Sequence, residues 1–254
     1  MLEQHGMLSC HPVSTPIAAN LHLLKLSLAE IDAWKYQSPL VSLMYLMLGN
    51  RPDIAYAIGI LSQHAATPGK AHWDALMRVY RYLRGTTNLK LTYRGSSKAE
   101  ELLGYVDADF AGDTVDRRST TGYAFILSSA AVSWASKRQH TVATSSTEAE
   151  YVAGSEAAKE AIWFRLILSE LGMLKEGPTE ILLDNQSAIA LAKNPVFHGW
   201  MRHVEVQHHF IREKLEDGVI TAEYVPTGDQ VADVLTKGLA REKHDQFVKG
   251  LGLE

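Results

Sequence analysis

The order in which helical and strand patterns follow one another is the feature that most constrains the fold. Short apolar or alternating runs predict strands at 102–107, 121–127 and 131–135, with turn-forming residues between them. A long helical pattern covers 145–172, and strand and helix patterns alternate after it. Closely spaced strands favour an antiparallel meander, whereas alternation of strand and helix is typical of parallel pairing. We therefore expect an α/β fold with one mixed sheet covered by helices.

Weaker patterns lie on either side of this region. Residues 1–33 show no sustained period and are expected to be a poorly ordered lead-in. A small helical segment is expected at 34–95, the α/β domain at 100–237 and a helical tail at 238–254. The remaining predicted elements are helices at 34–48, 53–64, 72–83, 185–193, 203–216, 229–237 and 242–249, and strands at 89–93, 180–183 and 219–225.

Composition excludes several classes of protein. Of the 254 residues, 46% are hydrophobic and 21% charged, which is typical of folded soluble chains and unlike disordered or collagen-like ones. Cys10 is the single cysteine of the sequence, so an internal disulfide and a four-thiolate zinc site are excluded. The most apolar stretch, 39–48, is shorter than the ~20 residues that span a bilayer. We expect no membrane span and no secretory signal.

Charge is distributed unevenly around a formal net value of −4. Residues 21–100 carry ten Lys/Arg and five Asp/Glu, whereas residues 101–254 carry fifteen and twenty-three. A basic segment can hold a polyanion, and excess carboxylates can hold a divalent metal beside it. Arg78, Arg81 and Arg84 recur at three-residue steps and form one stripe of a predicted helix. They are candidates for phosphate contacts, with a solvated helix face as the alternative.

Two aspartates follow or end strands that we expect to lie side by side. Asp107 ends strand 102–107 and Asp184 follows strand 180–183, so both would emerge at neighbouring carboxyl ends, where ligands usually bind. Asp109 shares a strand face with Asp107 and is a reserve ligand. Asp113 and Asp116 are expected to be turn residues.

Periodicity selects one glutamate and one further aspartate. Glu150 shares the apolar stripe of the long helix and is expected to face the sheet. Glu148 instead fits a capping box that begins at Ser145. Asp233 lies one turn inside the predicted helix 229–237, whereas Asp229 begins that helix as a cap.

These carboxylates suit a metal site, although two other interpretations remain. Oxygen ligands favour Mg²⁺ or Mn²⁺, and two ions about 4 Å apart can activate water and stabilise a leaving oxygen in phosphodiester hydrolysis. Acidic residues at strand ends and helix starts are also common without any metal. A zinc site is the second alternative, but its candidates lack a convincing third and fourth ligand on one helix. The zinc candidates are His203, Glu205, His208 and His209.

Eight stretches carry recognisable motifs in a fixed order. They are RPDIAYA (51–57), HWDALMRVYRYLRGT (72–86), GYVDADFAGD (104–113), RRSTTGYAF (117–125), SSTEAEYVA (145–153), LLDNQSAIALAKNP (182–195), HHFIREKLEDG (208–218) and YVPTGDQVADVLTK (224–237). Together they resemble the end of the reverse transcriptase and the ribonuclease H (RNase H) domain of Ty1/copia-type LTR retrotransposon Pol polyproteins. The resemblance covers nearly all of the chain from residue 38 onward.

The resemblance implies an RNase H-like fold, a five-stranded mixed sheet with helices on both faces. Residues 34–95 would then be a helical remnant of the C-terminal thumb or connection region of the reverse transcriptase, and 100–237 the RNase H-like domain. A Tyr-x-Asp-Asp polymerase motif is absent from the sequence, so DNA synthesis is not expected.

The family also implies a reaction and its residues. Asp107, Glu150, Asp184 and Asp233 match catalytic positions that bind two Mg²⁺ ions, for which Mn²⁺ can substitute, and the patterns above select the same four. The implied reaction is endonucleolytic hydrolysis of the RNA strand of an RNA–DNA hybrid, distinguished by its 2′-hydroxyls and minor-groove shape. Residues expected to bind nucleic acid are Arg78, Arg81, Arg84, Asn185 and Ser187.

Partners and alternative functions complete these expectations. We expect an RNA–DNA hybrid as partner, neither a membrane nor a small-molecule cofactor, and a location in the cytoplasm, in particles or in the nucleus; the oligomeric state stays open. A catalytically silent, nucleic-acid-binding transposon relic is the alternative function. A DDE-type integrase would need a glutamate on a late helix, whereas Glu223 lies in a predicted strand. Trp134, with Lys137 and Arg138, is expected either to contact the hybrid or to pack in the protein.

Overall fold

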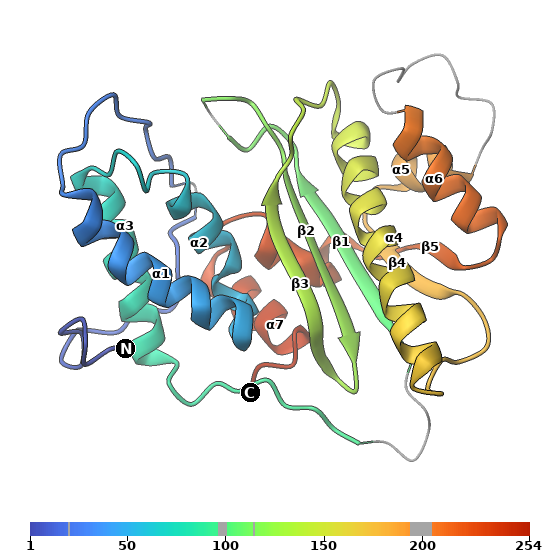
Figure 1. Cartoon of the computed structure of the whole chain (residues 1–254), viewed down its shortest axis with the longest axis horizontal. Coiled ribbons are helices and arrows are strands. Elements are labelled where there is room, and N and C mark those ends of the chain that lie inside the picture. Colours follow the sequence, from blue (N-terminus) through green and yellow to red (C-terminus); the bar gives the residue numbers. More distant parts are fainter. Residues whose placement is uncertain (20, 96–100, 114, 194–204) are drawn as a thin grey trace.

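The structure is a computed structural model that describes residues 1–19, 21–95, 101–113, 115–193 and 205–254. Helices come first, then three strands, then strands and helices in alternation (Figure 1). The helices are α1 (Ala33–Gly49), α2 (Ala55–Ser62), α3 (Lys70–Gly85), α4 (Ser146–Glu170), α5 (Gln186–Lys193), α6 (Glu205–Glu216) and α7 (Arg241–Gly250). The strands are β1 (Leu103–Asp109), β2 (Thr120–Leu127), β3 (Ala130–Arg138), β4 (Thr179–Leu183) and β5 (Ile220–Tyr224), and the 3₁₀ helices are η1 (Pro52–Ile54), η3 (Thr227–Asp229) and η4 (Val231–Leu235). None of the described helices has the length and apolarity needed to cross a membrane.

The described strands form one mixed sheet in the order β3-β2-β1-β4-β5. β1 pairs antiparallel with β2, and β2 pairs antiparallel with β3. β4 pairs parallel with both β1 and β5. The predicted antiparallel meander and parallel pairs are therefore confirmed. The strand predicted to end at Asp107 extends to Asp109. Asp107 therefore lies inside β1, and its predicted position at the strand end is wrong.

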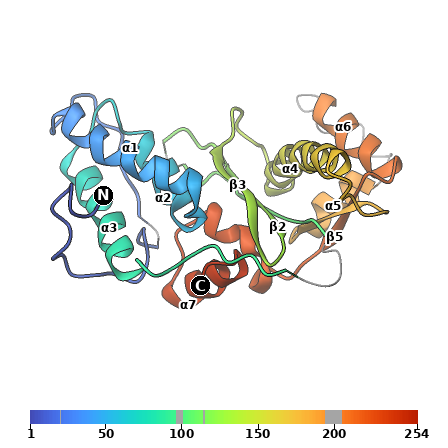
Figure 2. The ribbon, with the colours of Figure 1, turned by 60° about the horizontal axis from the view of Figure 1, so that its bottom comes forward.

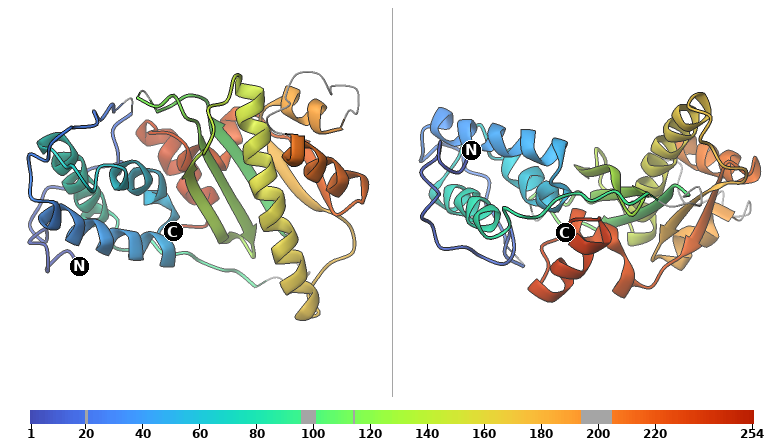
Figure 3. Two further views of the ribbon diagram at one scale, coloured as in Figure 1. Left: turned by 45° about the horizontal axis from the view of Figure 1, so that its top comes forward. Right: turned by 90° about the horizontal axis from the view of Figure 1, so that it is seen from below.

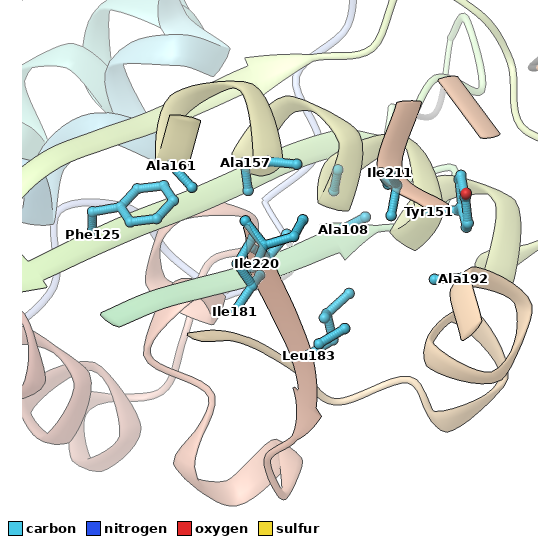
Figure 4. Close-up of a cluster of buried hydrophobic side chains, with 14 of the residues drawn as sticks. Ala108, Phe125, Tyr151, Ala157, Ala161, Ile181, Leu183, Ala192, Ile211 and Ile220 are labelled. Atoms are coloured by element: carbon cyan, nitrogen blue, oxygen red, sulfur yellow. The ribbon is translucent and has the colours of Figure 1, made fainter. Parts of the chain in front are cut away.

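One face of the sheet is covered by α4, with α5 and α6 beside it (Figures 1 and 3). Phe125 of β2 points to this face and packs in a buried core that contains Ala157, Ala161 and Ile181 (Figure 4). The small alanine side chains on this side of α4 allow the helix to lie close to the strands. The position of Glu150, two turns before Ala157 on the same helix, is set by this packing.

The opposite face is covered by η4 and α7, as the views in Figure 3 show. Because side chains alternate along a strand, Ala124 points to this face while its neighbour Phe125 points to the other. Ala124 packs with Val234, Leu235 and Phe247 in a second buried cluster. Helices on both faces of the sheet are therefore confirmed, and α7, from the predicted tail 238–254, contributes to one of them.

Helices α1, α2 and α3 surround a separate core beyond β3 (Figures 1 and 2). The stretch before α1 forms turns without a described helix or strand, and Figure 2 shows it running alongside α1 and α3. Ile17 and Leu23 from this stretch are buried in the same core. The segment expected to be a poorly ordered lead-in therefore contributes side chains to the packing of the helices.

A buried polar network in the helical segment is in contact with α7, which lies on the opposite face of the sheet from α4. Arg51 Nη2 lies 2.7 Å from Asp53 Oδ2, and both side chains are almost fully buried. Tyr82 donates a hydrogen bond to the same Asp53 oxygen at 2.7 Å. The ring of His244 on α7 packs edge-on against Tyr82, with 5.3 Å between centroids. Because each charge is paired and hydrogen-bonded, this buried network can be stable.

Two predicted elements are wrong. Residues 89–93 form no strand of the sheet: Leu91 makes an isolated bridge with Leu253, and the alternating Leu89 and Leu91 pack against the second cluster instead. The single helix predicted at 229–237 is replaced by η3 and η4. Gln230 separates them because its backbone is extended (φ −73°, ψ 94°) and its side chain turns into the protein.

Candidate metal centre and active site

Three aspartates meet where β1 and β4 lie side by side. Asp107 comes from β1, Asp184 directly follows β4 and Asp233 lies in η4. One carboxylate oxygen of each residue lies within 4.8 Å of the other two. Asp107 and Asp233 are 2% and 4% exposed, and Asp184 is half-buried. Three of the four predicted catalytic residues therefore form one compact cluster.

Glu150 lies near this cluster, on α4, but outside the group defined by the 4.8 Å distance. Its side chain is buried, and its Oε2 has no hydrogen-bond partner in the described part of the chain. Burial, with the charges of Asp107 and Asp184, raises the pKa of Glu150 to about 9, although a hydrogen bond from the Ala108 backbone opposes the rise. A buried carboxylate close to other carboxylates is stabilised by a cation or by protonation.

Glu148, the other glutamate of the same helix, has a structural role. Its Oε2 accepts hydrogen bonds from the backbone N and the Oγ1 of Thr144, at 2.7 and 2.6 Å. Its own backbone N–H donates to Ser145 Oγ at 3.1 Å. Ser145 therefore caps α4 as predicted, but the carboxylate of Glu148 binds Thr144, one residue before the N-cap, so the reciprocal half of the predicted capping box does not form.

A glycine on β2 allows the C-terminal segment to reach Asp107. Gly122 is the register partner of Asp107 in the β1–β2 pair. A Cβ at Gly122 would lie 2.5 Å from Thr236 Cγ2 and 2.9 Å from Leu235 Cβ. Since no side chain stands there, Thr236 approaches closely and donates a hydrogen bond from Oγ1 to Asp107 Oδ2.

Two other polar side chains of this segment, residues 227–237, hold the strand ends. Gln230 is fully buried, and its Nε2 donates to the carbonyl oxygens of Val106 at 2.8 Å and Leu182 at 3.4 Å. Thr227 donates from Oγ1 to Asp184 Oδ2 at 2.7 Å. The segment therefore fixes the carboxylates of the cluster as well as the backbone that carries them.

Lys237 brings a positive charge into the cluster. Its Nζ lies 2.9 Å from Asp233 Oδ1 and 3.7 Å from Asp107 Oδ2. Burial lowers the pKa of Lys237, but the charges of Asp107 and Asp233 outweigh this effect and raise it to about 12. Burial and the charge of Asp107 raise the pKa of Asp233 to about 7, against the opposing effect of Lys237.

Four residues of this site were not predicted from the sequence: Thr227, Gln230, Thr236 and Lys237. All four belong to the motif YVPTGDQVADVLTK (224–237), of which only Asp233 was assigned to the site. Their polar side chains among apolar neighbours were the available signal, but their partners lie on distant strands.

Asp109, the reserve ligand, does not belong to the 4.8 Å group of the described residues. Its carboxylate instead covers Gly112, where a Cβ would lie 1.9 Å from Asp109 Oδ2. Burial raises the pKa of Asp109, with the charge of Lys237 opposing and that of Asp107 adding to the rise. Asp109 therefore contributes negative charge near the cluster without joining it.

Comparison with known proteins places this arrangement in a family, although no family model matches the chain. The sequence is 43% identical over 263 residues to the retrovirus-related Pol polyprotein of transposon TNT 1-94 from Nicotiana tabacum, a match that covers 100% of this chain. It is 40% identical over 254 residues to the Pol polyprotein of transposon RE2 from Arabidopsis thaliana, again over 100% of this chain. The chain belongs to the copia-type retrotransposon Pol family. It spans 19% and 17% of the length of these two Pol polyproteins.

Solved structures similar to this Pol chain are RNase H domains. The N-terminal RNase H domain of a Mycobacterium tuberculosis protein, fused to maltose-binding protein, gives a TM-score of 0.39 at 15% identity, covering 59% of this chain and 97% of that one. LC11-RNase H1, solved with an RNA/DNA hybrid, gives 0.40 at 14% identity, covering 54% and 94%. The strand order, the helices on both faces and the family match identify the RNase H-like fold predicted from the sequence.

In this Pol chain the three predicted nucleic-acid-binding arginines lie on α3, beyond the β3 edge of the sheet and away from the cluster at β1 and β4 (Figure 1). Each of them donates a hydrogen bond to the stretch before α1. The pairs are Arg78 Nη2 to Thr15 Oγ1 at 2.9 Å, Arg81 Nε to the His11 carbonyl at 2.8 Å and Arg84 Nε to the Leu8 carbonyl at 2.8 Å. The arginine stripe therefore holds the N-terminal stretch, and its contact with phosphates stays a prediction.

Asn185 and Ser187 directly follow Asp184 in the chain. Asn185 Oδ1 accepts a hydrogen bond from the Ala188 backbone at 3.1 Å, at the start of α5. Ser187 is exposed beside it. These two residues therefore lie next to the cluster, as predicted, and the oxygen of Asn185 also stabilises the first turn of α5.

Trp134 and Arg138 have partners within the protein. Trp134 Nε1 donates to the Met47 carbonyl at 3.1 Å, so this tryptophan packs against the end of α1. Arg138 Nη1 lies 2.9 Å from both Asp113 Oδ2 and Asp116 Oδ2. The packing interpretation of Trp134 is confirmed, and the two aspartates stabilise the loop after β1 as expected of turn residues.

The remaining alternatives concern zinc and integrase chemistry. His203 and the side chains of Glu205, His208 and His209 lie outside the described residues. Glu223 lies in β5 and forms an exposed ion pair with Lys193 at 3.2 Å. An integrase site would need a glutamate on a late helix. Glu223 lies on a strand and does not meet this requirement.

Proposed function

We propose that this chain is a metal-dependent ribonuclease that hydrolyses the RNA strand of RNA–DNA hybrids. The observation that carries the proposal is the cluster of Asp107, Asp184 and Asp233 within 4.8 Å, with Glu150 beside it. The four acids come from distant parts of the chain, namely β1, α4, the residue directly after β4, and η4. The sequence resemblance to copia-type Pol polyproteins implies the same four positions. Such convergence of buried acids is typical of sites that bind cations.

The residues of the cluster fit Mg²⁺ or Mn²⁺. All the donors are carboxylate oxygens, which are the ligands that these hard cations prefer. Glu150 Oε2 is buried without a partner among the described residues, so it is available to a cation. The Lys237 ammonium, itself a positive charge, is close to both Asp233 and Asp107. Two bound divalent ions would supply an activated water and charge stabilisation of the leaving oxygen.

The chain itself supplies ligands in fixed positions. Thr236 holds Asp107, and Thr227 holds Asp184. Side chains that orient the ligands in this way reduce the rearrangement needed on binding. Because burial and the charges of Asp107 and Asp184 raise the pKa of Glu150, cation binding by this carboxylate is coupled to the loss of its proton.

Nucleic-acid contacts are proposed next to the cluster and, separately, on α3. Exposed Ser187 and half-buried Asn185 follow Asp184 and can donate to the sugar–phosphate backbone of a bound hybrid. Arg78, Arg81 and Arg84 would act through long-range charge or through phosphate contacts. If one of these arginines contacts a phosphate, its replacement by Met reduces the slope of log affinity against log salt by about 1.

The test compares duplexes of one sequence. Purified full chain is incubated with labelled RNA–DNA hybrid, double-stranded RNA or double-stranded DNA, in Mg²⁺, Mn²⁺ or EDTA. We expect internal cuts in the RNA strand of the hybrid alone, and no cuts in EDTA. A chain that binds the hybrid but leaves it intact with both metals would instead be a silent nucleic-acid-binding relic.

A further inference from the structure

The Lys237 ammonium lies among carboxylates of the aspartate cluster. It lies 2.9 Å from Asp233 and 3.7 Å from Asp107, two members of the aspartate cluster, and its side chain is 36% exposed. Both aspartates are buried, and Glu150 and Asp184 lie close to them. Carboxylates this close together repel one another strongly unless a positive charge stands among them.

We propose that Lys237 is a built-in, displaceable counter-ion, which neutralises the aspartate cluster in the metal-free protein and sets the metal affinity by competing for Asp233 and Asp107. The inference rests on the proposed function, because the competing cation is the divalent metal of that site. Lys237 acts through the aspartates and is a positioning residue.

The attachment of Lys237 suits a reversible contact. Its backbone N–H donates to the Asp233 carbonyl at 3.1 Å, which anchors the main chain. The ammonium stands on a flexible four-carbon stem, so rotation of the side chain alone can move it into solvent. Release therefore needs no change in η4 or in the strands.

A second ion pair in the same protein shows the contrast. Arg51 and Asp53 have side-chain exposures of 7% and 0%, and Arg51 forms two hydrogen bonds to Asp53 at 2.9 and 2.7 Å. That pair is almost fully shielded from solvent and is part of the packing. The Lys237 pair is open on one side, as a displaceable counter-ion requires.

Competition follows from charge. An ammonium and a divalent cation bound to the same aspartates would repel each other across a few ångströms, so both cannot hold Asp233 and Asp107. Part of the metal-binding free energy is then used to displace Lys237. Removal of the ammonium should destabilise the metal-free protein and strengthen metal binding.

The test measures metal binding and stability without any substrate. Lys237→Met keeps most of the stem and removes the charge, Lys237→Arg keeps the charge, and Lys159→Met removes an exposed lysine that pairs with Glu156 on α4. Mn²⁺ affinity is measured from the free-ion paramagnetic resonance signal, and the thermal midpoint is measured in EDTA. Circular dichroism confirms folding at the titration temperature.

We expect Lys237→Met to bind Mn²⁺ at least about fivefold more tightly and to melt a few degrees lower in EDTA than wild type. Lys237→Arg should retain the wild-type midpoint in EDTA, and Lys159→Met should match wild type in both measurements. Unchanged or weaker Mn²⁺ binding by Lys237→Met would overturn the inference.

The outcomes separate this inference from the proposed function. If wild type binds Mn²⁺ and cuts hybrid while Lys237→Met binds with wild-type affinity, the inference fails and the proposed function stands. If Lys237→Met binds more tightly and melts lower as expected, but wild type never cuts hybrid, the inference stands and the proposed function fails.

Discussion

Gln230 donates a hydrogen bond from Nε2 to the carbonyl oxygen of Val106 at 2.8 Å, one residue before Asp107. The parallel ladder between β1 and β4 pairs Tyr105 with Leu182 as its last pair among the described residues. Gln230 also donates to the Leu182 carbonyl at 3.4 Å, so its side chain continues the link between the strands beyond that pair. The spacing of the two strand ends that carry the cluster thus depends on a residue from the C-terminal segment.

Replacement of Gln230 should therefore destabilise the protein. Gln230→Leu keeps the side-chain volume but leaves the Val106 carbonyl without this buried donor, and we expect the free energy of unfolding to fall by about 1–3 kcal/mol. Urea denaturation in EDTA measures the change. Gln246→Leu is the control, because the Gln246 amide donates to the Gly228 carbonyl at an exposed site. Equal losses in the two variants would contradict the role given to Gln230.

Two glycines should respond to alanine in opposite directions. A Cβ at Gly154, inside α4, would meet Ile211 Cδ1 and Leu183 Cδ2 at 3.7 Å, which is ordinary contact. Gly154→Ala should stabilise the protein by about 0.5–1 kcal/mol, since alanine favours the helix. Gly122→Ala should destabilise it by about 1–3 kcal/mol, because its Cβ would overlap Thr236. Thermal midpoints of the two variants check this, and a shift of both in one direction would refute it.

The stability of the protein should decrease in mild acid because of His64. Burial, and then the charge of His72, lower the pKa of His64 from 6.5 to about 4. Between these values the unfolded chain binds more protons at this position than the folded one, so this contribution to stability is lost as pH falls from about 6.5 to about 4.

The measurement is the free energy of unfolding across that pH range. His64→Phe retains a ring to stack on His72, which His64 contacts at 4.0 Å between centroids, and should show a shallower loss of stability in acid. The exposed His11 provides the control His11→Gln. If His64→Phe and wild type lose stability equally with falling pH, His64 does not titrate as described.

The arginines of α3 should control the mobility of the N-terminal stretch. Arg84→Met removes the hydrogen bond to the Leu8 carbonyl, so amide exchange in residues 7–13 should rise by about two- to tenfold. Arg117→Met, at an exposed loop position, serves as the control. Unchanged exchange, together with a smaller salt dependence of hybrid binding, would assign Arg84 to phosphate contacts instead.

Much of the sheet and its acidic residues could be predicted from local sequence. The period-two runs identify β1, β2 and β3. The apolar stripe of the long helix favours Glu150, which lies near the aspartate cluster, over Glu148, which binds Thr144 at the start of α4. The same reasoning failed at residues 89–93, where alternating leucines pack against α7 and the tail without joining the sheet. Alternating leucines can be buried on one face of a sheet strand or, as here, against a helix. The alternation alone therefore does not distinguish a strand of the sheet from an extended segment packed beside it.

The contacts around the cluster could not be predicted in this way. Lys237 was visible four residues after Asp233, but its approach to Asp107 depends on how the segment 227–237 packs against the sheet, where Gly122 leaves room for Thr236. The direction of Gln230 likewise depends on two carbonyl groups from strands more than forty residues away. Such contacts arise from tertiary packing, which local propensity does not contain.

The proposed reaction is hydrolysis of the RNA strand of a hybrid by four carboxylates and a divalent metal. Its most direct test is the initial rate of hybrid cleavage in Mg²⁺ by wild type and by four single variants. The variants are Asp107→Asn, Glu150→Gln, Asp184→Asn and Asp233→Asn. Exposed Asp217, which pairs with Lys214, supplies the control Asp217→Asn.

We predict that each of the four variants cuts at least about a hundredfold more slowly than wild type, because each loses a metal ligand. Asp217→Asn should cut at the wild-type rate. A wild-type chain that cuts while Asp184→Asn or Glu150→Gln retains its rate to within about threefold would contradict the claim, since the chemistry would then not depend on these carboxylates.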